Sequence, residues 1–89
     1  MPDNADAFFK TANALIKIGD TDDAIRNYQQ AIRIKPDFVN AHCNLGVALF
    51  RKGDIDGSVA AFKAALRLKP DFKPAQQYLK KAMSVQLKK

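Results

Sequence analysis

Residues 39–72 read VNAHCNLGVALFRKGDIDGSVAAFKAALRLKPDF, and the 34 residues before them, ADAFFKTANALIKIGDTDDAIRNYQQAIRIKPDF, follow the same pattern without a gap. Twelve aligned positions are identical in the two stretches. In the first stretch these are Ala7, Ala14, Leu15, Gly19, Asp20, Asp22, Ala31, Arg33, Lys35, Pro36, Asp37 and Phe38. A duplication of this length predicts two equal structural units, 5–38 and 39–72, built from the same supersecondary motif.

Local signals predict that both units are helical. In the stretch 24–32, apolar residues recur three and four positions apart, which is the spacing of one helix face. Gly19 and Gly53 supply the left-handed backbone with which many helices end, whereas Pro36 and Pro70 cannot continue a helix. The sequence therefore predicts an all-α fold of five helices. Their expected ranges are about 5–18, 22–35, 39–52, 56–69 and 73–87.

The pattern resembles the tetratricopeptide repeat, whose signature has a period of about 34 residues and contains L-G-x-x-Y, A-x-x-x-F and a closing Pro. The matching residues are Leu45-Gly46-x-x-Leu49, Ser58-x-x-x-Phe62 and Pro70. The resemblance covers 5–72 as two full repeats and 73–87 as half of a third. It implies a right-handed solenoid of antiparallel helix pairs.

The expected domain organisation follows from this resemblance. Residues 1–89 form a single domain, with repeat 1 at 5–38, repeat 2 at 39–72, and a capping helix with a basic tail at 73–89. Lys80 occupies the position that Ala12 and Gly46 fill in the two repeats, where a following helix would have to come close. The last helix is therefore expected to close the array, and its apolar residues Leu79, Ala82 and Met83 are expected to face the preceding unit.

Composition argues against an enzyme. The chain has one His, one Cys and no Glu, and it contains no glycine-rich phosphate-binding loop. We therefore expect no catalytic residue, no metal site and no cofactor, and we interpret His42 as a packing residue. A single cysteine, Cys43, excludes an internal disulfide. The sequence contains no apolar run long enough for a membrane span and no signal-peptide pattern at its start, so a cytoplasmic protein is expected.

The resemblance implies a binding surface on the concave side, lined by the first helix of each pair. Its function would be to hold a peptide segment of a partner protein. Mapped onto this sequence, the surface comprises Phe9, Lys10, Asn13, Ile16, Lys17, Asn40, Cys43, Asn44, Val47, Phe50, Arg51, Gln77, Tyr78 and Lys81.

This set of side chains suggests what kind of peptide would bind. Aromatic and aliphatic residues could anchor apolar side chains, and Asn13 and Asn44 could bond a peptide backbone through both donor and acceptor. The Lys and Arg residues could attract carboxylates, so the expected partner has acidic as well as apolar character. The alternative is that the polar residues are only solvated, that Phe9 and Phe50 pack within the repeats, and that Cys43 is a small packing residue.

Two other functions stay open. Repeat arrays generally need about three units, and two and a half repeats leave the first helix uncovered, so a homodimer or an assembly scaffold is the first alternative. The second is nucleic-acid binding, because 15 Lys and Arg against nine Asp give a net charge of +6. That alternative ranks last, because no base-reading module accompanies the charge.

Overall fold

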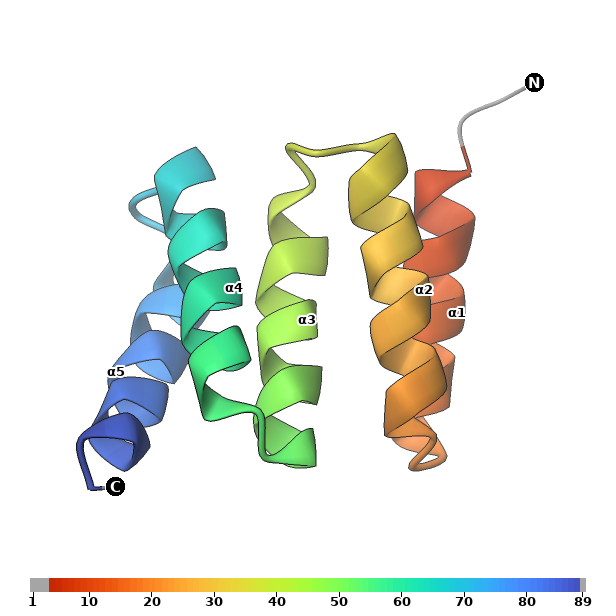
Figure 1. Ribbon diagram of the computed structural model, residues 1–89. Helices are drawn as coiled ribbons and strands as arrows, with labels where there is room; N and C mark the ends of the chain where they lie inside the picture. Colours follow the sequence, from red (N-terminus) through yellow and green to blue (C-terminus); the bar gives the residue numbers. More distant parts are fainter. Residues whose placement is uncertain (1–3, 89) are drawn as a thin grey trace.

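The computed structural model describes residues 4–88, which form five helices and no strand. They are α1 (Ala5–Lys17), α2 (Thr21–Ile34), α3 (Val39–Lys52), α4 (Ile55–Leu68) and α5 (Lys73–Leu87) (Figure 1). The predicted all-α fold is confirmed, and the predicted helix ranges differ from the observed ones by at most one residue at either end.

The turns inside the two repeats are built alike. Gly19 and Gly53 have positive φ angles of 84° and 94°, which the predicted left-handed helix ends require. The next residue, Asp20 or Asp54, donates its backbone N–H to a carbonyl five residues back, as in a Schellman motif. The Asp54 side chain then accepts a hydrogen bond from the backbone N–H of Gly57 at 2.9 Å and so caps α4. One glycine-aspartate pair therefore ends one helix and starts the next.

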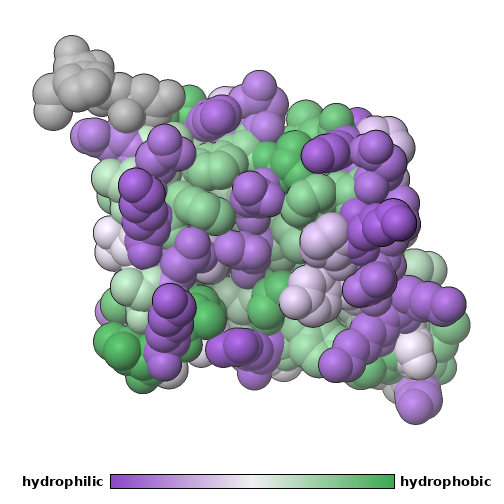
Figure 2. Space-filling view, turned by 180° about the vertical axis from the view of Figure 1, so that it is seen from behind, coloured by the Kyte–Doolittle hydropathy of each residue, from purple (hydrophilic) through white to green (hydrophobic). Residues whose placement is uncertain are grey.

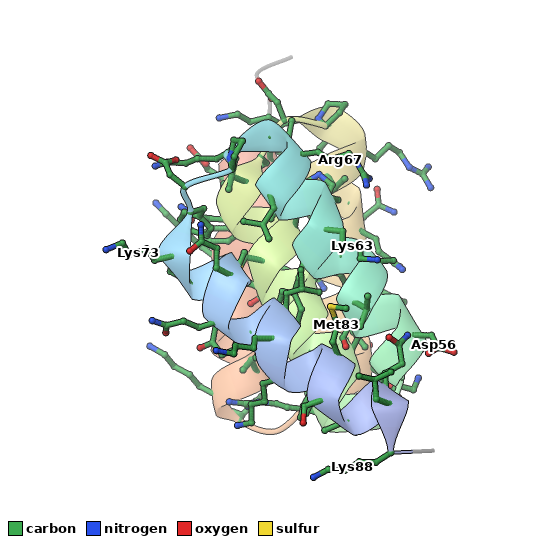
Figure 3. The ribbon with its side chains drawn as sticks, turned by 90° about the vertical axis from the view of Figure 1, so that its left-hand side faces the viewer. Asp56, Lys63, Arg67, Lys73, Met83 and Lys88 are labelled. Carbon is green, nitrogen blue, oxygen red and sulfur yellow. The ribbon has the colours of Figure 1, made fainter. Side chains whose placement is uncertain are left out.

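The helices form two layers. Seen from the α5 end in Figure 3, α2 and α4 lie in one layer, and α1, α3 and α5 lie in the other. Helices α1 and α5 each contact α3, whereas α2 and α4 do not contact each other in the described part of the chain. The helices of the α1–α3–α5 layer are therefore closer to one another than α2 is to α4. This difference curves the molecule, with the concave side on the α1–α3–α5 layer.

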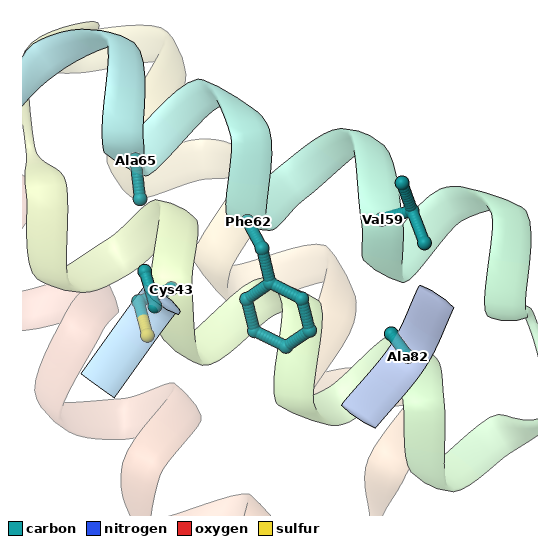
Figure 4. Close-up of a cluster of buried hydrophobic side chains, with 6 residues drawn as sticks. Cys43, Val59, Phe62, Ala65 and Ala82 are labelled. Carbon is teal, nitrogen blue, oxygen red and sulfur yellow. The ribbon is translucent and has the colours of Figure 1, made fainter. Parts of the chain in front are cut away.

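Small residues allow the helices to approach closely. Ala12, Ala24 and Ala48 are fully buried around Tyr28 in repeat 1. In repeat 2, a Cβ atom added at Gly46 would lie 2.5 Å from the Phe62 ring, so this position tolerates no side chain without repacking. Figure 4 shows the second cluster, in which Phe62 is surrounded by smaller buried side chains from α3, α4 and α5. These are Cys43, Val59, Ala65, Ala75 and Ala82.

Polar contacts between repeats also recur at the 34-residue period. Lys52 Nζ of α3 pairs with Asp22 Oδ1 of α2 at 2.7 Å, and Gln86 Nε2 of α5 donates to Asp56 Oδ1 of α4 at 2.9 Å. The Lys52 contact holds the pKa of Asp22 below its ordinary value. Since position 86 corresponds to 52 and position 56 to 22, α5 docks on repeat 2 as α3 docks on repeat 1.

The same equivalence applies to the turns that precede α3 and α5. His42 Nε2 lies 2.8 Å from the backbone carbonyl of Pro36, and Gln76 Nε2 donates to the carbonyl of Pro70 over the same distance. Because a carbonyl oxygen only accepts, His42 carries its proton on Nε2 in this contact. His42 is half-buried and ties α3 to the turn before it, consistent with a packing role.

The three residues of the last helix that were expected to face the preceding unit differ in burial. Ala82 is buried and Leu79 is half-buried, but Met83 is 38% exposed and lies at the surface of the molecule (Figure 3). Its equivalent in repeat 2, Leu49, packs against the buried cluster around Tyr28 of the preceding repeat.

Candidate functional site

Two neighbouring hollows lie on the concave side. The polar hollow has a volume of about 300 Å³, and its lining residues are Asn13, Ile16, Lys17, Tyr28, Asn44, Val47 and Tyr78. The aromatic hollow has a volume of about 260 Å³, and its lining residues are Val47, Phe50, Arg51, Phe62, Tyr78 and Lys81. Val47 and Tyr78 belong to both, so the hollows form one continuous groove. Figure 2 shows this side of the molecule, with apolar side chains exposed between rows of hydrophilic ones.

The two hollows occupy equivalent places in successive repeats. Adding 34 to the residue numbers of the polar hollow converts Asn13, Ile16, Lys17, Tyr28, Asn44 and Val47 into Val47, Phe50, Arg51, Phe62, Tyr78 and Lys81. These are all the residues that line the aromatic hollow. The backbone positions are therefore the same in both hollows, and only the side-chain chemistry differs.

A hydrogen-bonded triad forms the floor of the polar hollow. The Tyr28 hydroxyl donates to Asn13 Oδ1, and Asn44 Nδ2 donates to the same oxygen at 3.0 Å. Burial raises the pKa of Tyr28, so its hydroxyl keeps its proton at neutral pH. Because Asn13 Oδ1 receives both bonds, the orientation of each amide is determined. Asn13 Nδ2 and Asn44 Oδ1 have no further hydrogen bond within residues 4–88 and are left as a donor and an acceptor for a ligand.

Rings and cations make up the aromatic hollow. The Phe62 and Tyr78 rings stack with their centroids 5.6 Å apart and an interplanar angle of 15°. Phe62 is buried, whereas Tyr78 is 43% exposed and presents its free side to the groove. Lys81 Nζ lies 6.0 Å from the Phe50 ring centroid, a cation–π contact, and Arg51 is exposed beside it. The hollow therefore combines an apolar wall with two positive charges.

The structure brings most of the expected groove residues together. Asn13, Ile16, Lys17, Asn44, Val47, Phe50, Arg51, Tyr78 and Lys81 all line one hollow or both. Lys10, Asn40 and Gln77 are exposed but line neither hollow. Phe9 also lines neither, because its ring packs against Phe38 at 4.7 Å and Tyr28 at 6.0 Å. Packing within the repeat therefore describes Phe9, whereas Phe50 both packs against the Phe62 cluster and lines the aromatic hollow.

Cys43 does not belong to the groove. Its side chain is 3% exposed and lies in the core cluster around Phe62 (Figure 4). Burial raises the pKa of its thiol to about 11, so the sulfur stays protonated and unreactive at neutral pH. Cys43 faces inward because it occupies the place that Phe9 fills in repeat 1, and both residues turn toward the second helix of their repeat.

Sequence reasoning missed the two residues at the bottom of the hollows, Tyr28 and Phe62. Both come from the second helix of a repeat, α2 or α4, and reach the groove between the first helices. Their equivalence across 34 positions is visible in the sequence, but both lie on the second helix of a repeat, and the family resemblance assigns the groove to the first helices. No three His, Cys or Asp side chains of residues 4–88 converge to hold a metal ion.

Comparison with known families settles the kind of repeat. The model of the TPR repeat matches residues 12–53, and the model of the tetratricopeptide repeat matches residues 39–72. The chain belongs to the tetratricopeptide repeat family. The match over residues 39–72 of this tetratricopeptide repeat chain has the same bounds as repeat 2.

Solved structures of MamA are similar to this tetratricopeptide repeat chain. One crystal structure of MamA protein has a TM-score of 0.87 and 26% identity, covering 90% of this chain and 44% of that one. A second MamA crystal structure, with a TM-score of 0.76 and 24% identity, covers 94% of this chain and 59% of that one, and it supports the fold alone. The chain thus spans about half the length of these proteins. No curated protein sequence matches it. None of the helices within residues 4–88 has the length and hydropathy of a membrane-spanning segment.

Proposed function

We propose that this tetratricopeptide repeat protein binds a short extended segment of a partner protein in the groove formed by the polar and aromatic hollows. Membership of the family supports a protein–protein interaction module rather than an enzyme. The observation that carries the finer proposal is the side-by-side placement of two complementary features. One is the free donor and acceptor of Asn13 and Asn44, and the other is the exposed ring of Tyr78 beside two cations.

Charge supports a ligand with acidic residues. Arg51 and Lys81 line the aromatic hollow, Lys17 lines the polar one, and no Asp lines either. Neither Arg51 nor Lys81 takes part in an ion pair within residues 4–88. The positive potential of the groove is therefore not cancelled by the protein itself. A groove this short buries little area, so the expected affinity for an isolated peptide is micromolar.

The groove is tested with a displayed library of random decapeptides and three forms of the protein. The variant R51E/K81E reverses the two charges of the aromatic hollow. The matched control K63E/R67E makes the same charge change on the outer face of α4, away from the groove (Figure 3). Peptides selected on the wild type should bind R51E/K81E at least about tenfold more weakly and the control unchanged.

The selected sequences should be rich in Asp or Glu together with apolar residues. Circular dichroism establishes that both variants are folded before binding is compared. Equal binding of the selected peptides to all three proteins would show that they bind outside the groove.

Self-association is a second candidate function, favoured by the outer face of α1. Ala7 and Ala14 are exposed there, whereas their equivalents in repeat 2, Ala41 and Ala48, are fully buried. Ile18 at the end of α1 is 76% exposed. The outer face of α1 thus has small residues at the positions that pack tightly inside the array, and a second copy could cover them.

Light scattering after size exclusion, over a wide concentration range, tests this candidate. If α1 is a dimer contact, the mass should rise toward twice 9.9 kDa with concentration, and Ile18→Lys should abolish the rise. Ile34→Lys places the same charge at the end of α2 as a control and should leave the mass curve unchanged. A monomer at every concentration would rule out assembly through α1.

A further inference from the structure

We infer that the groove binds its peptide ligand in a fixed register. The aromatic hollow takes one large apolar side chain that has a carboxylate next to it, and the polar hollow bonds the ligand's main chain about three residues away. This inference rests on the proposed function and goes further, because it assigns a separate task to each hollow and a spacing between them.

The aromatic hollow has the properties of an anchoring site. Tyr78 is held in place by its stack on the buried Phe62 ring, yet 43% of its surface is still exposed. An aromatic or branched aliphatic side chain could cover that surface and also contact Val47 and Phe50, which line the same hollow. Well-packed aromatic residues of this kind carry most of the binding energy in protein interfaces. Val47 and Tyr78 line both hollows, but Phe50 and Phe62 line this one alone, and the equivalent positions of the polar hollow carry Ile16 and Tyr28.

Two cations favour a carboxylate beside the anchored side chain. Arg51 comes from α3 and Lys81 from α5, and both line the aromatic hollow. An apolar residue in the hollow therefore places its chain neighbours close to both charges. A neighbouring Asp or Glu would gain charge-assisted hydrogen bonds, whereas a neighbouring Lys or Arg would be repelled.

The polar hollow is suited to a main chain instead of a side chain. Its equivalent wall positions carry Asn13 and Asn44 in place of Val47 and Tyr78. One amide of a peptide presents a carbonyl acceptor and an N–H donor, and these complement Asn13 Nδ2 and Asn44 Oδ1. Because every residue of a peptide carries these groups, the polar hollow accepts many sequences and determines only the position of the chain.

The spacing follows from the packing of the helices. The polar hollow uses positions of α1 and α3, and the aromatic hollow uses the equivalent positions of α3 and α5. Helix α3 contacts both α1 and α5. Helices in contact pack about 8–10 Å apart, and an extended chain rises about 3.3 Å per residue. One step along the groove therefore corresponds to about three residues of an extended ligand.

The first test uses synthetic octapeptides with blocked ends, containing Gly and Ser with one central Phe-Asp pair. Titration into the ¹⁵N-labelled protein should shift the amide signals of the residues that line the groove, and the shifts give the dissociation constant. Replacing Phe by Ser in the peptide should abolish measurable binding. Replacing Asp by Asn should weaken binding about threefold. Equal binding of the Ser-Asp and Phe-Asp peptides would overturn the assignment of the aromatic hollow.

The second test measures the register by methylating the backbone nitrogens of the Phe-Asp peptide one at a time. Methylation removes one N–H donor. It should weaken binding about fivefold at a single position, which lies about three residues from Phe on one side of it. In Asn44→Ala, which lacks the accepting oxygen but keeps the Tyr28–Asn13 bond, that penalty should disappear. A penalty that peaks elsewhere, or that persists in Asn44→Ala, would refute the register.

The two levels of the proposal fail in different ways. If peptides selected from the random library bind the groove but show no Phe-to-amide spacing, the register is wrong and the peptide-binding function stands. If neither the selected peptides nor the Phe-Asp peptide perturbs the groove residues, both are refuted.

Discussion

At the scale of single residues, position 43 shows how a side chain on the expected binding helix can serve the core instead. Cys43 and Asn44 are adjacent on α3, but one is 3% exposed in the Phe62 cluster and the other lines the polar hollow. Neighbours on a helix point about 100° apart, so adjacent residues have different environments. The chemistry of Cys43 is therefore that of a buried thiol.

The raised pKa of Cys43 predicts a dependence of stability on pH. Burial raises it from an ordinary value of 9.0 to about 11, so the unfolded chain loses this proton at lower pH than the folded chain does. Since the folded state then binds more protons, the free energy of unfolding should fall as the pH rises from 9 to about 11. Urea denaturation across this range should show a smaller fall for Cys43→Ala. The buried Tyr28 hydroxyl acts in the same direction, but it is present in both proteins and cancels. Parallel curves for the two proteins would contradict a buried thiol.

At the scale of helices, the internal repeat provides pairs of equivalent residues that lie in different environments. Ala14 of α1 and Ala48 of α3 are equivalent residues of identical type, but Ala14 is exposed and Ala48 is fully buried against repeat 1. The difference arises only because α2 covers α3 and no described helix covers the corresponding face of α1. The same substitution at the two positions therefore isolates the effect of packing between repeats.

We expect Ala48→Leu to lower the free energy of unfolding by about 1–3 kcal/mol, because the larger side chain has no space beside Ala24 and Tyr28. Ala14→Leu should change the free energy of unfolding by no more than about 0.5 kcal/mol, because its side chain extends into solvent. Urea denaturation of both variants measures the two values. Similar losses would show that the Ala14 face is also covered in solution, as the dimer candidate requires.

At the scale of the whole molecule, α5 has two roles. It buries Ala75 and Ala82 against repeat 2 and donates a hydrogen bond from Gln86 to α4. It also carries Tyr78 and Lys81, one wall of the aromatic hollow. Because each unit of a repeat protein is stabilised by its neighbour, the last helix contributes to both stability and binding. Its role as the cap of the array stays a prediction.

Deletion of residues 73–89 should lower the urea midpoint and remove peptide binding, because repeat 2 loses its cover and the aromatic hollow loses a wall. Deletion of residues 88–89 alone removes only the end of the basic tail and should change neither property. Chemical denaturation and the library peptides measure both effects. An unchanged midpoint after loss of α5 would mean that two repeats alone form the stable unit.

The number of helices, their limits and their equivalence were determined by the sequence alone, because these depend on local signals. Gly53 and Asp54 end one helix and begin the next through contacts with residues at most five positions away. Most of the groove could also be predicted, since the family resemblance identifies α1, α3 and α5 as its walls.

Only the tertiary structure decided which side chains reach the groove and what they do there. Phe9 and Cys43 turn inward, whereas Tyr28 and Phe62 reach the groove from the second layer. These choices depend on the sizes of side chains on helices distant in sequence, and a single helix carries no information about them. Packing of the repeats placed equivalent backbone positions side by side as two hollows, and the residue types at those positions, Asn13 and Asn44 against Val47 and Tyr78, made one hollow polar and the other aromatic.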